Sequence, residues 1–292
     1  MIDLAVDPVL LWASGRREDL PWRRTRDPWA VLVSESMLQQ TQVARVVPRY
    51  RRFLERFPTV AACAEAGVGA VVAEWAGLGY NRRAVNLHRS AVVVVEEHDG
   101  VFPDELASLL ALPGVGPYTA RAVLAFAFER DAAVVDTNVG RVLARQMGQR
   151  LTPALAQRVA DSLVPEDRSW AWNQAMLDLG ALICTKRSPT CDRCPARSSC
   201  AWVAAGSPSP DPAIGSAGVS AGQSRFEGSF RQGRARLLDH LRSGVALMPA
   251  DLTTACGWTD RVDGDAEARR AAASLVRDGL AVTGADGSLR LP

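Results

Sequence analysis

The sequence predicts an all-α protein with a small additional domain at its C-terminus. From Trp29 to Ala204 apolar residues recur every three or four positions, with hardly any strand-like alternation. Residues 205–224 have no such period and consist mostly of Gly, Ser, Ala and Pro, which is typical of a flexible linker. With 292 residues, of which 48% are hydrophobic, the chain is long enough for two or three domains. We therefore expect a helical body over residues 1–204, a linker over 205–224 and a separate domain over 225–292.

Helix signals follow one another along the body. Asp27 and Pro28 combine a capping carboxylate with a proline at the first helical position, and they lead into WAVLVSESMLQQTQVARVV as one helix. Apolar periodicity then predicts helices over residues 59–75, 82–98, 104–110, 117–128, 139–145, 153–163 and 170–184.

The segment after the linker has its own pattern. RQGRARLLDHLRSG, PADLTTACGW and DAEARRAAASLVRDGLAV each predict a short helix, and ADGSLRLP predicts a turn between two short strands. Three helices and a β-hairpin are typical of a winged helix. Such modules either bind DNA or contact other proteins, and the sequence leaves both interpretations open.

Charge and the N-terminal segment narrow the classes of partner. The net charge is only +2, so a polyanion would have to meet a local basic face. Lys186 is the only lysine among 34 lysines and arginines. The N-terminus has no basic start followed by a long apolar run, and no stretch reaches the roughly 18 uncharged apolar residues of a membrane span. We expect a soluble, cytoplasmic monomer without a membrane partner.

Four cysteines form the most specific spacing in the chain. Cys184, Cys191, Cys194 and Cys200 are spaced C-x6-C-x2-C-x5-C, and Pro195 follows the close pair. This set favours a [4Fe-4S] cluster, because structural zinc sites usually contain two close pairs or histidine. Zinc remains the competing ligand interpretation. The alternative without a metal is a pair of disulfides, but nothing marks the protein as secreted, and the other two cysteines are isolated.

A glycine-containing run lies between two predicted helices. Its two glycines allow the backbone to present consecutive N–H groups at the start of the second helix, which can hold phosphate oxygens without reading sequence. The purely structural interpretation is a tight turn between helices that binds no phosphate. The full run LPGVGPYTARAV resembles the helix-hairpin-helix motif, and together with the downstream cysteines it is similar to the endonuclease III superfamily of DNA glycosylases. This resemblance implies DNA contacts from Leu112, Gly114, Val115 and Gly116.

In that superfamily an aspartate follows the hairpin helix, and VVDTNV supplies Asp136 at a break between helices. Cleavage of a base from deoxyribose develops positive charge on the sugar, which a fixed carboxylate stabilises. The purely structural interpretation is that Asp136 caps the next helix. One side chain can both cap a helix and stabilise the charge on the sugar.

Glu35 is the second candidate carboxylate. Val31, Leu32 and Leu38 lie at three- and four-residue offsets from it, so its helix face is apolar. A carboxyl group partly removed from water has a raised pKa and can donate a proton to a leaving base. The alternative is that Glu35 is a solvated residue at the edge of its helix with no catalytic role.

Further segments make the resemblance more specific. DLPWRRTRDPWAVLVSESMLQQTQVARVVPRY, WAGLGYNRRAVNLHRSA, VVDTNVGRVLAR and NQAMLDLGALICT look like the A/G-mismatch-specific adenine DNA glycosylases, the MutY family, over residues 10–202. The resemblance implies a two-lobed helix-hairpin-helix body, with a six-helix lobe over residues 28–135 and an iron–sulfur lobe over residues 1–27 and 136–204.

The same resemblance assigns roles and a partner. It implies Glu35 as proton donor to adenine and Asp136 as oxocarbenium stabiliser, with Asn138 beside it. Residues that would wedge into the base stack are Leu38, Gln40 and Tyr80, and residues that would line the adenine pocket are Trp22, Arg23 and Asp178. Base extrusion is required because the glycosidic bond is inaccessible inside an intact stack. The implied partner is double-stranded DNA with adenine opposite guanine or 8-oxoguanine, at the bacterial nucleoid.

Tyr118 indicates the type of reaction. Relatives that also cut the strand have a lysine at this position, just after the GVG turn, and form a Schiff base with it. With tyrosine here, the resemblance implies base removal by water and an abasic product. Tyrosine also occurs at this position in thymine mismatch glycosylases, so it does not choose the base.

The chain departs from the family after residue 224. Most relatives continue into a Nudix-like domain that recognises 8-oxoguanine, and the tail here is too short and too helical for that fold. Two alternatives therefore remain at this point: a thymine or uracil mismatch glycosylase on the same scaffold, and a non-catalytic iron–sulfur protein that binds DNA. The joint presence of Glu35 and Asp136 favours an enzyme.

Overall fold

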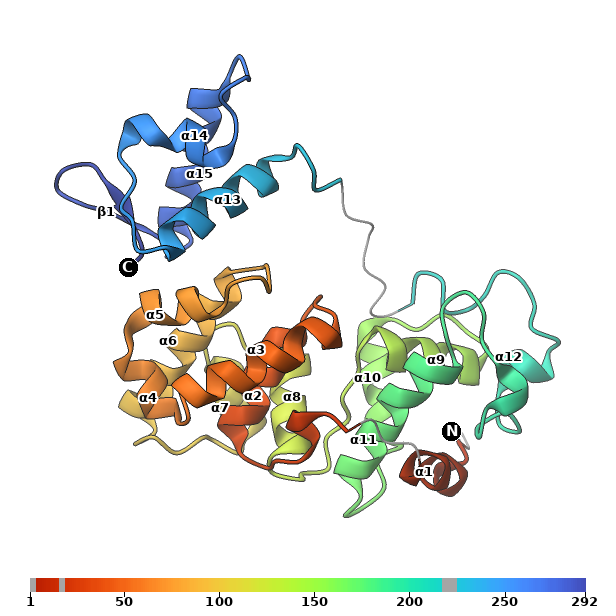
Figure 1. Ribbon diagram of the computed structural model, residues 1–292. Coiled ribbons are helices and arrows are strands. Elements are labelled where there is room, and N and C mark those ends of the chain that lie inside the picture. The colour runs from red at the N-terminus through yellow and green to blue at the C-terminus, as the bar shows by residue number, and fades with distance from the viewer. Residues whose placement is uncertain (1–3, 16–18, 217–224) are drawn as a thin grey trace. The chain divides into compact units, whose positions relative to one another are not determined.

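The computed structural model describes residues 4–15, 19–216 and 225–292, which form two compact units (Figure 1). The first unit combines the described residues up to 32 with residues 104–110 and 115–216, and the second combines residues 33–103, 111–114 and 225–292. Helices dominate both units, which confirms the predicted fold class. Within the described part of the chain, no helix is long and apolar enough to cross a membrane.

The first unit is assembled from three separate stretches of the chain. Its elements are α1 (Val6–Ser14), η1 (Pro21–Arg23), the start of α2 (Pro28–Leu38), most of α7 (Leu106–Ala111), α8 (Pro117–Phe126), α9 (Thr137–Met147), α10 (Pro153–Asp161), α11 (Ser169–Asp178), η2 (Leu179–Ile183), η3 (Cys191–Arg193) and α12 (Ala201–Ala204).

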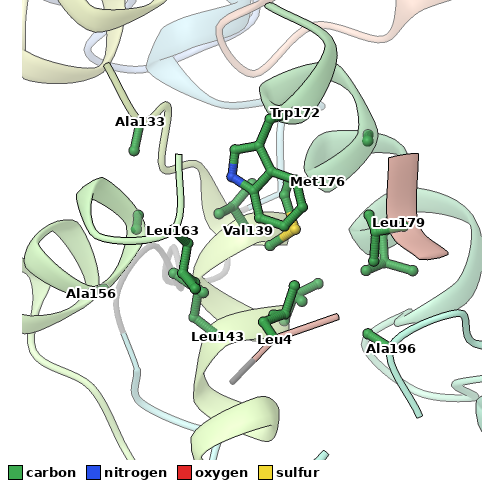
Figure 2. Close-up of a cluster of buried hydrophobic side chains, with 14 of the residues drawn as sticks. Leu4, Ala133, Val139, Leu143, Ala156, Leu163, Trp172, Met176, Leu179 and Ala196 are labelled. Atoms are coloured by element: carbon green, nitrogen blue, oxygen red, sulfur yellow. The ribbon is translucent and has the colours of Figure 1, made fainter. Parts of the chain in front are cut away.

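A hydrophobic cluster holds this unit together. Trp172 and Met176 of α11 converge on Val139 and Leu143 of α9, and Ala196 of the cysteine segment belongs to the same cluster (Figure 2). All five side chains are buried. The core therefore fixes α9 against α11 and against the cysteine segment that follows them.

The second unit contains the remaining helices and the β-hairpin. Its elements are the end of α2, α3 (Val43–Arg56), α4 (Val60–Glu65), α5 (Gly67–Glu74), α6 (Arg82–Glu97), α13 (Phe230–Arg242), η4 (Pro249–Asp251), α14 (Leu252–Cys256), α15 (Gly264–Arg277), β1 (Val282–Thr283) and β2 (Leu289–Arg290).

Two predicted helices are interrupted. The helix predicted from Pro28 onward ends at Leu38 and resumes at Val43, because Gln40 has a left-handed φ of 54° that an α-helix cannot contain. The helix predicted over residues 59–75 is divided at Gly67, whose φ is 77°. Thr59 caps the first piece, since its hydroxyl accepts a hydrogen bond from the Ala62 N–H at 3.1 Å.

The helix predicted over residues 170–184 changes character before its end. After α11 the chain forms a π-helical turn, η2, in which the Cys184 N–H donates to the Leu179 carbonyl at 2.8 Å. Such turns are rare and are frequently found at functional sites. Here the π-turn leads directly into the first of the four cysteines.

The residues after α12 are attached to the first unit. The Arg145 guanidinium of α9 pairs with Asp211 at 2.6 Å, and the Leu151 N–H donates to the Ser216 hydroxyl at 3.1 Å. Residues 211–216, which composition assigned to a flexible linker, therefore make specific contacts. The last part of that predicted linker, residues 217–224, lies outside the described residues.

The C-terminal segment has the elements that the sequence predicted. Helices α13, α14 and α15 pack together, and β1 pairs antiparallel with β2 through Val282–Arg290 and Thr283–Leu289. Leu247 adds a bridge to Leu289. The backbone of Gly233 lies against the Trp258 ring and leaves no room for a Cβ. That this segment functions as a winged helix remains a prediction.

Candidate active site

Asp136 lies at the N-cap of α9. Its Oδ1 accepts hydrogen bonds from the backbone N–H groups of Asn138 at 2.8 Å and Val139 at 2.7 Å, and its Oδ2 accepts from Asn138 Nδ2 at 2.9 Å. Burial raises the pKa of Asp136 above its usual value, while these hydrogen bonds and the charge of Arg141 act in the opposite direction. The carboxylate is thus a helix cap held in one orientation and largely removed from water.

A chain of hydrogen bonds connects Asp136 with the cysteine segment. Arg141, one turn further along α9, donates through Nη2 to Asn138 Oδ1 at 2.8 Å and to the Gly180 carbonyl at 2.7 Å. Its Nε donates to the Cys184 carbonyl at 2.6 Å. A Cβ on Gly180 would lie 2.6 Å from the Cβ of Asn138, so the π-turn can approach α9 only with glycine at this position. Asn138 is therefore fixed from two sides.

Arg23 and Asp178, both predicted to line the adenine pocket, form an ion pair. Arg23 Nη2 donates to Asp178 Oδ1 at 2.6 Å, and Nη1 donates to Oδ2 at 3.2 Å. The two side chains are only 11% and 15% exposed. Trp22, the third residue predicted for the pocket, is buried in η1 next to Arg23. The bidentate pair gives this part of the unit a fixed polar surface.

Glu35 lies in the second unit, near the end of α2. It is 5% exposed and belongs to a stretch of α2 that is buried on every side from Trp29 onward. Leu38, the last residue of α2, is half-buried. The Glu35 side chain is thus largely removed from water, and its role as an acid stays a prediction.

Gln40 and Tyr80 lie on two neighbouring loops of the same unit. Gln40 follows α2 and is exposed, and Tyr80 precedes α6 and is 46% exposed. Both are non-glycine residues in the left-handed region, with φ of 54° and 46°. Sequence reasoning identified these two side chains and did not identify Arg83, whose guanidinium contacts both loops.

In the hairpin between α7 and α8, one of the two glycines has a left-handed conformation and the other is extended. Gly114 has a φ of 76°, and its Cα lies so close to Asn86 that a Cβ would be 2.5 Å from Asn86 Nδ2. Gly116 is the N-cap of α8, and nothing lies within 4 Å of the position where its Cβ would be. Leu112 and Val115 are buried and anchor the turn. The first turn of α8, which includes Tyr118, thus begins at an open backbone position suited to an anion.

The four cysteines line one small cavity with Arg145 and Trp202. None of the four forms a disulfide. Burial, and then the neighbouring Cys184, Cys200 and Cys191, raise the pKa of the Cys194 thiol to about 11. Arg145, 2% exposed, donates to Cys184 Sγ at 3.3 Å and to the Thr185 carbonyl at 2.8 Å. Among the described side chains, no three from His, Cys, Asp and Glu are grouped so as to hold a single metal ion.

Lys186, the only amine side chain in the sequence, lies on this same cysteine segment. It is exposed, and its carbonyl accepts from Arg145 Nη2 at 3.3 Å. Besides Arg83, sequence reasoning missed Arg141, Arg145 and Gly180. The available signals were a glycine within the helical pattern DLGALIC and two arginines spaced by four residues on α9.

A hairpin that presents backbone groups, a half-buried aspartate that caps a helix, and a four-cysteine loop together indicate a helix-hairpin-helix DNA repair scaffold. Residues 33–165 match the family described as HhH-GPD superfamily base excision DNA repair protein. A solved structure of a thermostable thymine-DNA glycosylase superposes with a TM-score of 0.65 at 32% identity, covering 68% of this chain and 95% of that one.

Two curated relatives extend the similarity to nearly the whole chain. The adenine DNA glycosylase of Mycolicibacterium smegmatis is 42% identical over 99% of this chain and 97% of its own length. That of Mycobacterium tuberculosis is 41% identical over 97% of this chain and 92% of its own length. The chain belongs to the adenine DNA glycosylases of the HhH-GPD superfamily.

Proposed function

We propose that this protein is a monofunctional adenine DNA glycosylase, which hydrolyses the N-glycosidic bond of adenine mispaired with guanine or 8-oxoguanine and leaves an abasic site. The observation that carries the proposal is the fixed Asp136 carboxylate in a chain 42% identical to an adenine DNA glycosylase over 99% of its length. The enzyme would act on double-stranded DNA in the bacterial cytoplasm.

Asp136 supports the charge that develops on the sugar. As the glycosidic bond breaks, C1′ and the ring oxygen of deoxyribose become positive, and a carboxylate that is already oriented stabilises that charge without reorganising. The bonds from Asn138 and Val139 hold Asp136 in that orientation and favour its ionised form. Arg141 in turn holds Asn138 and is therefore a positioning residue.

Glu35 supplies the proton that adenine needs. Adenine leaves poorly as an anion, so protonation of a ring nitrogen must accompany bond cleavage. A buried glutamate on a helix can deliver that proton to a base that has left the stack. Water then adds to C1′ and loses one proton, which restores the protonated Glu35, so that hydrolysis leaves free adenine and an abasic deoxyribose.

Strand cleavage through a Schiff base is not part of the proposal. That reaction requires an amine nucleophile beside the extruded sugar. The second residue of α8 is Tyr118, and Lys186 lies on the cysteine segment. We therefore expect an intact strand after adenine is released.

Other residues of the site recognise the base and the DNA. The Arg23–Asp178 pair and Trp22 would line the adenine pocket, with donors and acceptors held in place by the bidentate contact. Leu38, Gln40 and Tyr80 would fill the gap in the stack, and the hairpin from Leu112 to Gly116 would hold the DNA backbone.

The cysteine loop has a donor set that fits a [4Fe-4S] cluster. Four reduced thiols line one cavity, and the buried Arg145 guanidinium donates to the first of them. When bound, the cluster would supply structural order to the loop that carries Lys186 and Arg187. Metal analysis of the purified protein tests this assignment, and zinc in place of iron would contradict it.

A thymine glycosylase is the second candidate, because the thermostable thymine-DNA glycosylase matches the fold at 32% identity. A panel of duplexes with adenine, thymine or uracil opposite guanine or 8-oxoguanine separates the two. We expect adenine release alone, with strand breaks only after alkali. Release of thymine, or strand cleavage without alkali, would contradict the proposal.

A further inference from the structure

We propose that Arg83 is a positioning residue for base extrusion. Its guanidinium fixes the two loops that carry the proposed wedge residues Gln40 and Tyr80, and it also fixes the end of α2, the helix that carries Glu35. This inference rests on the proposed function, because it takes Gln40 and Tyr80 as side chains that fill the gap in the base stack. All of these residues except the first part of α2 lie in the second unit.

One side of the guanidinium binds the end of α2. Arg83 Nη1 donates to the carbonyls of Ser36 at 2.6 Å, Met37 at 3.0 Å and Gln39 at 2.7 Å. Carbonyls in the last turn of a helix have no intrahelical partner, and a cation is favourable at that end of the helix dipole. Arg83 therefore fixes the turn that follows Glu35 and leads into Gln40.

The other side binds the loop before α6. Arg83 Nη2 donates to the carbonyls of Leu78 at 3.3 Å and Gly79 at 3.0 Å, and Nε donates to the Tyr80 carbonyl at 3.3 Å. The same Nη2 donates to Thr41 Oγ1 at 3.1 Å, and the Thr41 hydroxyl donates to the Leu78 carbonyl at 3.3 Å. Arg83 and Thr41 thus bridge the two loops directly.

Both loops contain strained backbone that requires such support. A non-glycine residue in the left-handed region costs on the order of 1 kcal/mol and persists only where its surroundings enforce it. Gln40 and Tyr80 both have this conformation. Two of the three residues proposed to enter the stack therefore have a backbone conformation that needs support from outside their own loops.

The guanidinium is suited to this position and an ammonium is not. Arg83 lies over the Trp75 and Tyr80 rings, with its Cζ 5.4 and 5.5 Å from their centroids. Burial lowers the pKa of Arg83 to about 10, so it remains charged at neutral pH. A lysine has one nitrogen and three donors, so it can bind one set of carbonyls and cannot span both.

The test compares Arg83→Lys with Arg89→Lys, an exposed arginine on the same helix. Three quantities are measured on a duplex with 2-aminopurine beside the mismatched adenine: the fluorescence rise on binding, the single-turnover rate of adenine release, and the duplex affinity. Hydrogen exchange of the free protein is followed at residues 36–42 and 77–83.

We expect Arg83→Lys to lose most of the fluorescence rise and to release adenine about tenfold to 100-fold more slowly, as for misplaced groups at other active sites. Duplex affinity should fall much less, and exchange should rise at the two loops alone. Arg89→Lys should match the wild type. Thr41→Val, which removes the Thr41 contacts with Arg83 and Leu78 and leaves the carbonyl contacts of Arg83, should show a smaller loss in the same direction.

Three results would overturn the proposal. The first is wild-type base extrusion and a wild-type rate of adenine release in both Arg83→Lys and Thr41→Val. The second is a loss of duplex affinity in Arg83→Lys with normal extrusion. The third is increased hydrogen exchange throughout the second unit in Arg83→Lys, which would make Arg83 a general anchor of the fold. Wild-type protein that releases no adenine would instead overturn the proposed function, and this inference with it.

Discussion

Replacement of Asp136 by Asn separates the helix-capping role of this residue from its proposed role in catalysis. Asn is about as good an N-cap as Asp, so the bonds from the backbone N–H groups of Asn138 and Val139 can remain. The contact between Asn138 Nδ2 and Oδ2, 2.9 Å long, would be lost, because two amide nitrogens would then face each other. Losing one hydrogen bond of this kind costs about 1 kcal/mol.

The charge acts in the opposite direction on stability. Burial raises the pKa of Asp136 in the folded protein, so the protonated form contributes stability at low pH, and that contribution is lost as pH rises through the folded pKa. At neutral pH the variant no longer buries this charge. We therefore expect the free energy of unfolding of Asp136→Asn to stay within about 1 kcal/mol of the wild type, with the difference moving in favour of the variant as pH rises.

Catalysis should respond very differently. Loss of the negative charge beneath the sugar should lower the single-turnover rate of adenine release by about 10²- to 10³-fold. In the wild type the rate should fall as pH drops through the raised pKa of Asp136, because only the ionised form stabilises the sugar cation.

A matched control is available at the next helix. Thr152 caps α10 by accepting a hydrogen bond from the Leu155 N–H at 3.3 Å. Thr152→Ala should lower the free energy of unfolding by about 1 kcal/mol and leave the rate unchanged. If Asp136→Asn were as active as the wild type, Asp136 would be a helix cap alone and the reasoning would be refuted.

Three further predictions concern the surroundings of the site. Gly180→Ala places a Cβ 2.6 Å from the Cβ of Asn138 and should lower the single-turnover rate of adenine release by at least about tenfold. The control is Gly15→Ala, because nothing lies within 4 Å of the position where its Cβ would be. An unchanged rate in Gly180→Ala would contradict the packing argument. Borohydride should trap no enzyme–DNA adduct with the wild type or with Lys186→Ala, and an adduct with either would show amine catalysis. Cys194→Ser removes one of the four thiols that line the cavity and should reduce both bound iron and the unfolding temperature, so an unchanged ratio of iron to protein would refute the ligand assignment.

Local signals in the sequence were sufficient for much of the fold. Asp27 with Pro28, and Asp136 with the residues after it, mark helix starts through groups that contact backbone only two or three positions away. Capping, glycine turns and cysteine spacing are all encoded over a few residues. The all-α body was accordingly predictable, whereas the catalytic roles of Glu35 and Asp136 stay predictions.

What escaped prediction depends on partners distant in the sequence. Arg141 binds carbonyls 39 and 43 positions away, and Arg145 binds Asp211 66 positions away. Neither pairing leaves a local pattern. The Asp211 contact also explains why residues rich in Gly, Ser and Pro are attached to the first unit where composition predicts a linker.

Backbone strain escaped prediction for the same reason. Gln40 lies within a continuous helical pattern, yet its left-handed conformation ends α2. Because the supporting contacts of Arg83 come from another helix, the break could be known only from the folded chain.

The measurement that tests the central claim most directly uses Glu35→Gln on a duplex with adenine opposite 8-oxoguanine, with binding and adenine release followed separately. Gln has nearly the shape of Glu, but its amide has no acidic proton that can be transferred to the leaving base. We predict that the variant binds the mismatched duplex as the wild type does and releases no measurable adenine. Release at the wild-type rate would contradict the claim that two carboxylates, Glu35 and Asp136, carry out the hydrolysis.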